Sequence, residues 1–367
     1  MGMLVCIAGL TYLAFIGILH LGWSKATQEP STDLSSQREV LELTIVIPFR
    51  NEVKNIGFLL NDLIACEIPK NTKLHIKWVD DGSDDGSTVF VSKAIAGYDQ
   101  HLLIRNSGRG KVDALRTGIQ ATDSPWIITL DADIRLPSDW MRRISFHLSS
   151  SDASDMLILP LYGIVGETLI SKYGCIDFAS LVCSSLAMGA LGRPIMANGA
   201  HLAFKRKYAT WSNEIVSGDD VFLLHNIKSQ GGQIKVIADK RLQVMTDMPA
   251  TWTELISQRT RWASKARQYT DRDTLIIGWY LLFLNLLIWV LLCAGIFKSE
   301  LLYLSLMLLL VKSIADWTFV IRSLDWTGQR SLIPLLPLAS LIQTLMYPVA
   351  FFNRYFSGFD WKGRHYQ

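Results

Sequence analysis

The chain has 367 residues, enough for one large domain or two, and half of its residues are hydrophobic whereas only 19% are charged. The net charge of +3 is modest and no nucleic-acid-binding module is recognisable, so we expect no nucleic-acid partner. The five cysteines do not have the spacing of metal ligands, and small buried side chains are their simplest interpretation.

Long uncharged segments predict a membrane protein. Segments without any Asp, Glu, Lys or Arg occupy residues 1–24, 275–297 and 332–352. Each is close to the roughly 20 residues that a helix needs to cross a bilayer. The first lacks a basic start and a small-x-small cleavage site, which favours a retained anchor over a cleaved signal peptide. Residues 301–321 are a fourth candidate, in which Lys312 and Asp316 have the i, i+4 spacing to pair inside a helix bundle.

Apolar runs alternate with helical patterns along the central part of the chain. The predicted strands are residues 43–48, 74–79, 101–104 and 127–130. This alternation predicts an α/β fold with a mostly parallel, doubly wound sheet, whose functional residues lie at strand ends. Residues 171–191 are apolar and rich in small side chains. We expect them to form a helix that is too polar to span the membrane and lies at its interface.

These patterns divide the chain into six parts. They are an anchor at 1–24, a linker at 25–41, an α/β domain at 42–248, a basic amphipathic interface helix at 249–272, a transmembrane block of two or three helices at 273–353 and a basic tail at 354–367. Basic residues gather just before the transmembrane block, which is typical of the cytoplasmic side. We therefore expect a multi-pass protein of the plasma (bacterial inner) membrane with its α/β domain in the cytoplasm. A re-entrant last segment would return the basic tail to that side.

Two carboxylates follow the fourth predicted strand. Asp131 and Asp133 flank one small residue at the point where a buried parallel strand ends. Mg²⁺ and Mn²⁺ prefer hard oxygen ligands and often take only one or two carboxylates, which leaves positions for substrate phosphates. The pair therefore indicates a divalent metal shared with a phosphate group, although such pairs also occur in solvated loops.

Four polar motifs occur in order, each after an apolar element. They are Asp80-Asp81, Asp131-Ala132-Asp133, Asp219-Asp220 and Gln258-Arg259-Thr260-Arg261-Trp262. Together with Ile47-Pro48-Phe49-Arg50-Asn51-Glu52, this set resembles the family 2 inverting glycosyltransferases with a GT-A fold. More narrowly, it is similar to their membrane-bound branch, which includes ceramide glucosyltransferase, bacterial lipid glycosyltransferases and the cellulose, chitin and hyaluronan synthases. The resemblance covers about residues 43–267.

The resemblance implies a nucleotide-sugar donor, by the family's habit a UDP-sugar. It assigns donor binding to Pro48, Arg50, Glu52, Asp80, Asp81, Lys111, Asp131, Asp133 and Arg261. Carboxylates at the first two strand ends would bind the uracil and the ribose, whereas Lys111 and Arg261 would face the diphosphate. Asp131 and Asp133 would hold Mg²⁺ or Mn²⁺, with Asp133 as the direct ligand. Helix capping by Asp80 and Asp81 is the alternative interpretation.

An inverting transfer needs a base that deprotonates the acceptor hydroxyl. The resemblance gives this role to Asp220, with Asp219 where the family usually has Glu; a pair that only caps a helix is the alternative. Gln258, Trp262, Asn198 and Gly199 would contact the acceptor, for which Trp262 would be an apolar platform. Lipid-headgroup contact is the alternative for the Gln-x-x-Arg-Trp motif (residues 258–262), and we interpret the nearby His201 as structural.

The leading hypothesis is a membrane-embedded inverting glycosyltransferase with a lipid or lipid-linked glycan acceptor. A processive polysaccharide synthase has the same motifs, but four short hydrophobic segments make a thin wall for a polymer channel. A nucleotidyltransferase also uses paired carboxylates and a metal, although it commonly has a Gly-rich basic loop early in the chain. An inactive membrane scaffold is the last alternative.

Overall fold

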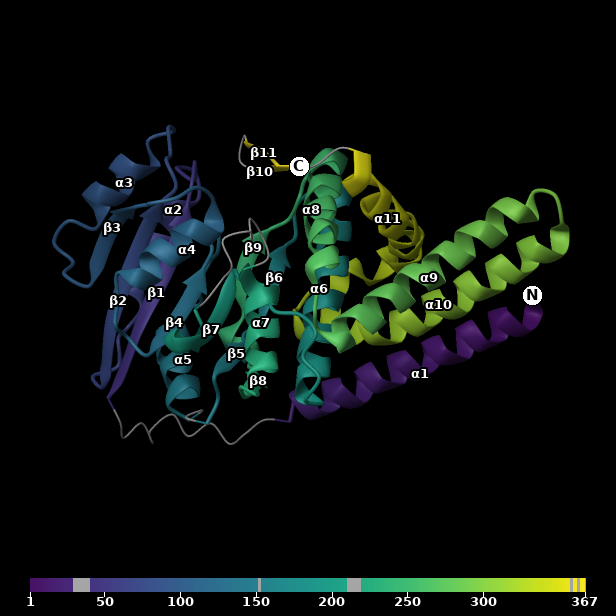
Figure 1. Ribbon diagram of the computed structural model, residues 1–367, viewed down its shortest axis with the longest axis horizontal. Coiled ribbons are helices and arrows are strands. Elements are labelled where there is room, and N and C mark those ends of the chain that lie inside the picture. The colour runs from purple at the N-terminus through teal and green to yellow at the C-terminus, as the bar shows by residue number, and fades with distance from the viewer. Residues whose placement is uncertain (29–39, 151–152, 210–218, 357–358, 362–363, 367) are drawn as a thin grey trace. The chain divides into compact units, whose positions relative to one another are not determined.

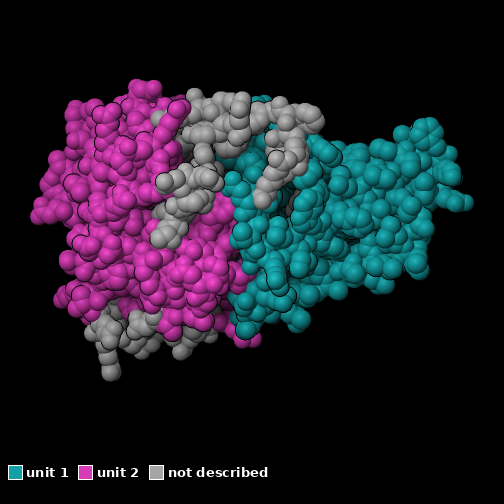
Figure 2. All heavy atoms as spheres, in the orientation of Figure 1, with its two compact units in different colours: residues 1–25, 163–193, 248–367 teal, residues 26–162, 194–247 magenta. Residues whose placement is uncertain are grey.

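The computed structural model describes residues 1–28, 40–150, 153–209, 219–356, 359–361 and 364–366. Most of the predicted linker, Gly218 before the Asp219-Asp220 pair, and parts of the predicted tail lie outside the described residues. The chain forms two compact units (Figure 2). The α/β unit comprises residues 26–162 and 194–247, and the helical unit comprises residues 1–25, 163–193 and 248–367.

A seven-stranded sheet forms the α/β unit, in the order β3-β2-β1-β4-β7-β5-β8 (Figure 1). Its strands are β1 (Leu41–Phe49), β2 (Thr72–Asp80), β3 (His101–Arg105), β4 (Trp126–Leu130), β5 (Met156–Ile158), β7 (His201–Lys205) and β8 (Ile234–Val236). Strands β3, β2, β1 and β4 are parallel to one another, and β5 and β8 are parallel to each other, whereas β7 is antiparallel to β4 and β5. The predicted mostly parallel sheet is therefore confirmed, and all four predicted strands are present.

Burial on both faces explains why β1 is an almost continuous apolar run. Ile45 and Ile47 on one face and Val46 on the other have no exposed surface, as expected for a central strand that is covered on both sides. Helix α4 packs on β1 and β2. A Cβ atom at Gly118 of α4 would lie only 2.5 Å from Val46 Cγ1, so glycine permits this close approach.

Shorter elements complete the α/β unit. Its helices are α2 (Ile56–Ala65), α3 (Ser87–Ala94), α4 (Lys111–Gln120), α5 (Trp140–Ser149), α7 (Asp219–Ser229), η1 (Arg206–Tyr208) and η2 (Lys240–Leu242). Strands β6 (Leu161–Ile164) and β9 (Val244–Asp247) form a separate two-stranded sheet. The boundary between the two units passes through β6.

The helical unit contains most of the long apolar helices. Its helices are α1 (Gly2–Ala26), α6 (Leu169–Ala190), α8 (Trp252–Ser264), η3 (Lys265–Gln268), α9 (Arg272–Gly295), α10 (Ser299–Trp326), η4 (Arg330–Leu335) and α11 (Leu336–Phe356). Strands β10 (Phe359–Trp361) and β11 (Arg364–Tyr366) form an antiparallel pair. Within the described residues, α1, α6, α9, α10 and the stretch 330–353 are long and apolar enough to cross a membrane.

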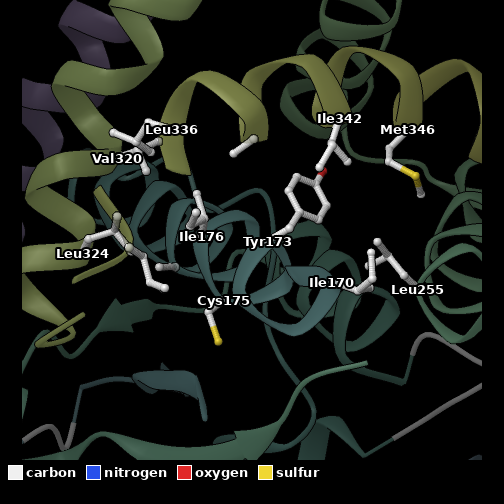
Figure 3. Packing of buried hydrophobic residues seen from close by; sticks show 13 residues of the cluster. Ile170, Tyr173, Cys175, Ile176, Leu255, Val320, Leu324, Leu336, Ile342 and Met346 are labelled. Carbon is white, nitrogen blue, oxygen red and sulfur yellow. The ribbon is translucent and has the colours of Figure 1, made fainter. Parts of the chain in front are cut away.

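Helix α6 differs from the sequence-based expectation. It is apolar enough to span, and 78% of its most apolar window is buried, more than in the other four candidates. Its buried positions include Tyr173, Cys175 and Ile176, which pack with Leu255 of α8 and with residues of α10, η4 and α11 (Figure 3). The polar and small residues that argued against a span lie largely inside the protein, where neighbouring helices cover them. Residues 163–193 therefore belong to the compact helical unit. The sequence analysis had included them in the α/β domain at 42–248.

Candidate active site

The polar motifs of the α/β unit follow the ends of neighbouring parallel strands. Phe49 at the end of β1 is paired with Asp80 at the end of β2, and β4 ends one residue before Asp131. Because β1, β2 and β4 run in the same direction, their C-terminal ends meet at one edge of the sheet. This is the edge at which open α/β sheets bind ligands.

Asp80 is fully engaged by its own loop. Its Oδ1 accepts hydrogen bonds from the Ser83 backbone N–H at 2.9 Å and the Ser83 hydroxyl at 2.6 Å, and its Oδ2 accepts one from Thr88 Oγ1 at 2.9 Å. These contacts shape the turn between β2 and α3, but they do not cap the helix, because the N-cap of α3 is Gly86, which has no side chain to form a cap.

Asp81 fixes the turn that precedes α4. Its Oδ1 accepts hydrogen bonds from Asn106 Nδ2 at 2.8 Å and from the Gly110 N–H at 2.9 Å, and Asp81 is 4% exposed. Asn106 also donates to the Gly110 carbonyl at 3.3 Å. Sequence reasoning missed Asn106; its only signal is its place at the start of the Ser-Gly-Arg-Gly turn before Lys111. Asp81 thus sets where Lys111 begins its helix.

The residues after β1 hold the same loop from the other side. Arg50 Nη1 donates to the carbonyls of Asp81 and Gly82, each at 2.9 Å. Glu52 is 7% exposed, and its carboxylate accepts a hydrogen bond from Asn55 Nδ2 at 2.9 Å. Pro48 lies past Val46, where the pairing of β1 with β4 ends, so its missing N–H removes no hydrogen bond to β4.

Lys111 links two of the predicted motifs. Its Nζ lies 2.7 Å from Asp131 Oδ1 and 3.8 Å from Asp219 Oδ2. Burial alone would lower the pKa of the ammonium, but the charges of Asp131 and Asp219 and the hydrogen bond to Asp131 outweigh it and raise the pKa above its usual value. Lys111 is therefore a permanently charged cation between the end of β4 and the start of α7.

Asp133 lacks such a strong cationic partner. Burial raises the pKa of its carboxyl to about 6, and the charges of Asp131 and Asp247 act in the same direction, against a backbone hydrogen bond and Lys111. A half-buried carboxylate beside other carboxylates gains from a bound cation. Among the described residues no group of three or more His, Cys, Asp or Glu side chains is placed to hold a metal ion. Asp131 and Asp133 are hard oxygen donors, which would suit a divalent cation that takes its other ligands from substrate phosphate and water.

Asp219 and Asp220 begin α7, and Gly199 lies beside them. Asp220 Oδ1 accepts a hydrogen bond from the Val221 N–H at 2.8 Å, and its Oδ2 accepts one from the Gly199 N–H at 3.1 Å. A Cβ atom at Gly199 would lie 2.6 Å from Asp219 Oδ2 and 3.4 Å from Lys111 Nζ. Glycine therefore allows the Asp219 carboxylate and the Lys111 ammonium to lie close to the backbone at residue 199.

Asn198 and His201 shape the segment that carries Gly199. Asn198 Oδ1 accepts a hydrogen bond from the Ala200 N–H at 3.0 Å. His201 is fully buried; its Nε2 lies 3.0 Å from Trp140 Nε1, and its Nδ1 lies 2.8 Å from the Pro160 carbonyl oxygen. Because an indole N–H can only donate, His201 accepts at Nε2 and donates at Nδ1, which is the neutral form. Burial lowers its pKa to about 4, in agreement with a structural role.

The Gln-x-x-Arg-Trp motif lies on α8 in the helical unit. The helix begins with a capping box between Thr251 and Glu254. Within the motif, the Arg259 guanidinium carbon lies 4.2 Å from the centroid of the Trp262 ring. Arg259 also forms an ion pair with Asp177 of α6, a residue that sequence reasoning missed although an acid in an apolar helix is a recognisable signal. The predicted site residues thus fall into a cluster in the α/β unit and a separate group on α8.

A mixed, mostly parallel sheet with carboxylates at its strand ends, accompanied by long apolar helices, defines a GT-A fold with membrane-type helices. The model of "Glycosyl transferase family 2" matches residues 44–207, and that of "Glycosyl transferase family group 2" matches residues 126–349. The chain therefore belongs to glycosyltransferase family 2.

Relatives of this chain include enzymes of polymer and of lipid-linked sugar synthesis. It is 23% identical over 248 residues to a poly-β-1,6-N-acetyl-D-glucosamine synthase of Staphylococcus aureus, which covers 64% of this chain and 57% of the relative. It is 29% identical over 113 residues to an undecaprenyl-phosphate 4-deoxy-4-formamido-L-arabinose transferase of Proteus mirabilis, which covers 30% of this chain and 35% of the relative. The chain thus spans about half, or less, of the length of these relatives.

A solved structure confirms the fold. The mannosyltransferase of Pyrobaculum calidifontis in complex with GDP-Man and Mn²⁺ has a TM-score of 0.54 at 15% sequence identity, and the match covers 93% of this chain and 99% of that chain. At this level of identity the likeness concerns the fold.

Proposed function

We propose that this protein is a membrane-embedded inverting glycosyltransferase that transfers a sugar from a nucleotide sugar, a UDP-sugar by our expectation, to a lipid or lipid-linked acceptor. One observation carries the proposal: the Lys111 ammonium lies within 4 Å of both Asp131, which follows β4, and Asp219, which begins α7. A fixed cation beside the two acidic motifs suits a diphosphate leaving group next to a general base. The family match favours glycosyl transfer over the nucleotidyltransferase alternative.

In this mechanism Asp220 is the base and Asp219 its neighbour. Asp220 takes the proton of the acceptor hydroxyl as the hydroxyl oxygen attacks the anomeric carbon of the donor. The bond from that carbon to the nucleoside diphosphate breaks, the electron pair leaves with the diphosphate, and the configuration inverts. The Gly199 N–H holds the Asp220 carboxylate in place at 3.1 Å. Lys111 stabilises the negative charge that develops on the leaving diphosphate, and we assign the same role to Arg261 of α8.

Donor recognition is assigned to the loops at the ends of β1 and β2. Glu52 and Asp81 supply carboxylates that bind the nucleobase and the ribose of the donor. Asp80, Arg50 and Pro48 shape the loop that presents these carboxylates. The support is the network of hydrogen bonds in which Arg50 and Asp80 are already engaged.

Asp133 and Asp131 would hold Mg²⁺ or Mn²⁺, with Asp133 as the direct ligand. Such an ion, when bound, neutralises diphosphate charge and orients the leaving group. The raised pKa of Asp133, which is due first to burial and then to the charges of Asp131 and Asp247, is in accord with this assignment, because a cation would stabilise the charged carboxylate.

The acceptor side is assigned to Asn198 and Gly199 of the α/β unit and to Gln258 and Trp262 of α8. Span-length helices in the chain and the similarity to an undecaprenyl-phosphate sugar transferase favour a lipid acceptor at the plasma membrane, with the α/β unit in the cytoplasm. Processive polymer synthesis is the second candidate. It is favoured by the longer match, over 64% of this chain, to a poly-β-1,6-N-acetyl-D-glucosamine synthase.

The test is a donor and product assay on detergent-purified protein. A panel of nucleotide sugars is offered with bacterial lipid extract and Mg²⁺ or Mn²⁺, and we measure nucleoside diphosphate release, product size and the anomeric configuration of the product. Asp133→Asn and Asp220→Asn are run beside Asp123→Asn, a control whose side chain is fully exposed. We expect one lipid-soluble product of inverted configuration, made by the control and by neither site variant.

The other outcomes discriminate between the candidates. A ladder of sizes would identify the polymer synthase. Pyrophosphate release would identify a nucleotidyltransferase. Full activity in both site variants, or no release with any donor, would refute the proposed function.

A further inference from the structure

Arg259 and Thr260 occupy the two x positions of the Gln-x-x-Arg-Trp motif and have no role in the proposed reaction. Each of them is nevertheless held by a different long apolar helix. Arg259 Nη2 donates to Asp177 Oδ2 of α6 in an ion pair. Thr260, which is 1% exposed, accepts a hydrogen bond at its Oγ1 from Asn353 Nδ2 of α11 at 3.0 Å. Helix α8 is therefore fastened at two successive positions, from two sides.

The ion pair also reaches the aromatic residue of the motif. The side chains of Asp177 and Arg259 are only 9% and 11% exposed, and the guanidinium carbon lies 4.2 Å from the centroid of the Trp262 ring. A guanidinium stacks flat on an indole while its edge binds a carboxylate. Asp177, Arg259 and Trp262 thus form one chain of contacts from α6 to the ring.

Apolar packing next to the pair makes this connection stiff. Tyr173 lies one turn before Asp177 on α6, and Leu255 lies one turn before Arg259 on α8; both belong to the same buried cluster (Figure 3). The cluster fixes the spacing of the two helices, so the ion pair is left to fix the direction of the Arg259 side chain. A carboxylate inside an apolar helix is costly. Removing one partner of a buried pair strongly destabilises the protein, because the other charge is then buried without a partner.

We propose that Asp177 and Arg259 are positioning residues that hold the Trp262 ring in the orientation in which it meets the acceptor. The inference rests on the proposed function of Trp262 as the acceptor platform. Without the carboxylate, Arg259 loses its partner among the described residues, because its Nη1 is buried and has none there. The guanidinium then turns toward another acceptor, and the ring loses the cation that covers one face. The site cation Lys111 and the acidic pairs take no part in this chain of contacts.

The kinetic test compares three variants with the wild type in detergent. We expect Asp177→Asn to raise the KM for the acceptor roughly tenfold, since small misplacements of a positioning group have effects of this size or more, and to leave the KM for the donor unchanged. Asp177→Glu keeps the carboxylate and should restore most of the acceptor KM. Asp316→Asn is the matched control, because it removes a carboxylate that pairs with a buried cation, Lys312, on another helix.

A second measurement does not depend on turnover. The protein is labelled with 5-fluorotryptophan, and the ¹⁹F resonance that disappears in Trp262→Phe is assigned to Trp262. We expect this resonance to move in Asp177→Asn and in Arg259→Lys, which keeps the charge but not the planar stack, and to stay in place in Asp316→Asn.

The two arms separate failure of this inference from failure of the proposed function. An active wild type whose acceptor KM is the same in Asp177→Asn, or an unmoved Trp262 resonance, overturns the positioning role. Equal losses of donor and acceptor parameters in Asp177→Asn and Asp316→Asn would mean that the pair acts only on stability, which also overturns it. If the wild type has no transfer activity but the Trp262 resonance moves in Asp177→Asn, the proposed function is refuted and the contacts from Asp177 to Trp262 remain supported.

Discussion

Acidification is expected to destabilise the protein through His201. This residue starts β7, where it is paired with Leu130, the residue before Asp131, so it supports the edge of the sheet that carries the site. Its pKa is lowered by burial from 6.5 to about 4. The unfolded chain therefore binds a proton at a higher pH than the folded one does. The contribution of neutral His201 to the free energy of unfolding is complete above the pKa of the unfolded chain and decreases as the pH falls below that pKa.

The size of the effect follows from the two pKa values. One pKa unit corresponds to about 1.4 kcal/mol, so the full loss approaches about 3 kcal/mol near pH 4 and is about 2 kcal/mol near pH 5. Protonation at Nε2 would also oppose the N–H of Trp140, which lies 3.0 Å away and can only donate. The loss therefore has a structural cause that a substitution can remove.

The assay is thermal unfolding of the wild type and of His201→Gln at several pH values. Glutamine can accept from Trp140 and donate to the Pro160 carbonyl, but it does not titrate. We expect the wild type to be the more stable protein near neutral pH and the difference to shrink by about 2 kcal/mol near pH 5. Asp239 does not interfere, because hydrogen bonds and charges from His147 and Arg143 outweigh burial and hold its pKa at about 2. A difference between the two proteins that is constant with pH would refute the reasoning.

Three further predictions concern activity and stability. Gly199→Ala should lower turnover roughly tenfold or more with little change in melting temperature, because its Cβ would lie 2.6 Å from Asp219 Oδ2; unchanged turnover would contradict this. Asp81→Ala should raise the KM for the donor, since it releases the two hydrogen bonds that fix the turn before α4. Steady-state kinetics at saturating acceptor measure this KM, and an unchanged value would contradict the prediction. Lys312→Met should destabilise the helical unit by about 3 kcal/mol in denaturant titrations, because it leaves Asp316 buried without its cation, whereas adding Asp316→Leu should recover most of the loss; a double variant as unstable as the single one would count against it.

Much of the fold follows from local sequence pattern. The apolar run around Ile45 and the alternation with helices predict a buried parallel strand because burial on both faces leaves no place for polar side chains. The long apolar helices were recognisable for a similar reason, since the length and apolarity that a bilayer requires can be read locally from the sequence. Helix α6 has the length and apolarity of a span although polar residues such as Asp177 led us to expect otherwise, because the sequence does not show what covers those residues.

The sequence by itself determined which chemical groups are present and near which strand ends they occur: the carboxylates of Asp131 and Asp133, the acidic pair at residues 219–220, and the arginine and tryptophan of the α8 motif. Only the tertiary structure decided their partners. That Lys111 lies between Asp131 and Asp219, that Asp80 serves its own loop, and that Asp177 reaches Arg259 depend on how distant segments approach one another. Strand and helix periodicity is a local property of the chain, whereas an ion pair depends on distances of a few ångströms that only the packed core fixes.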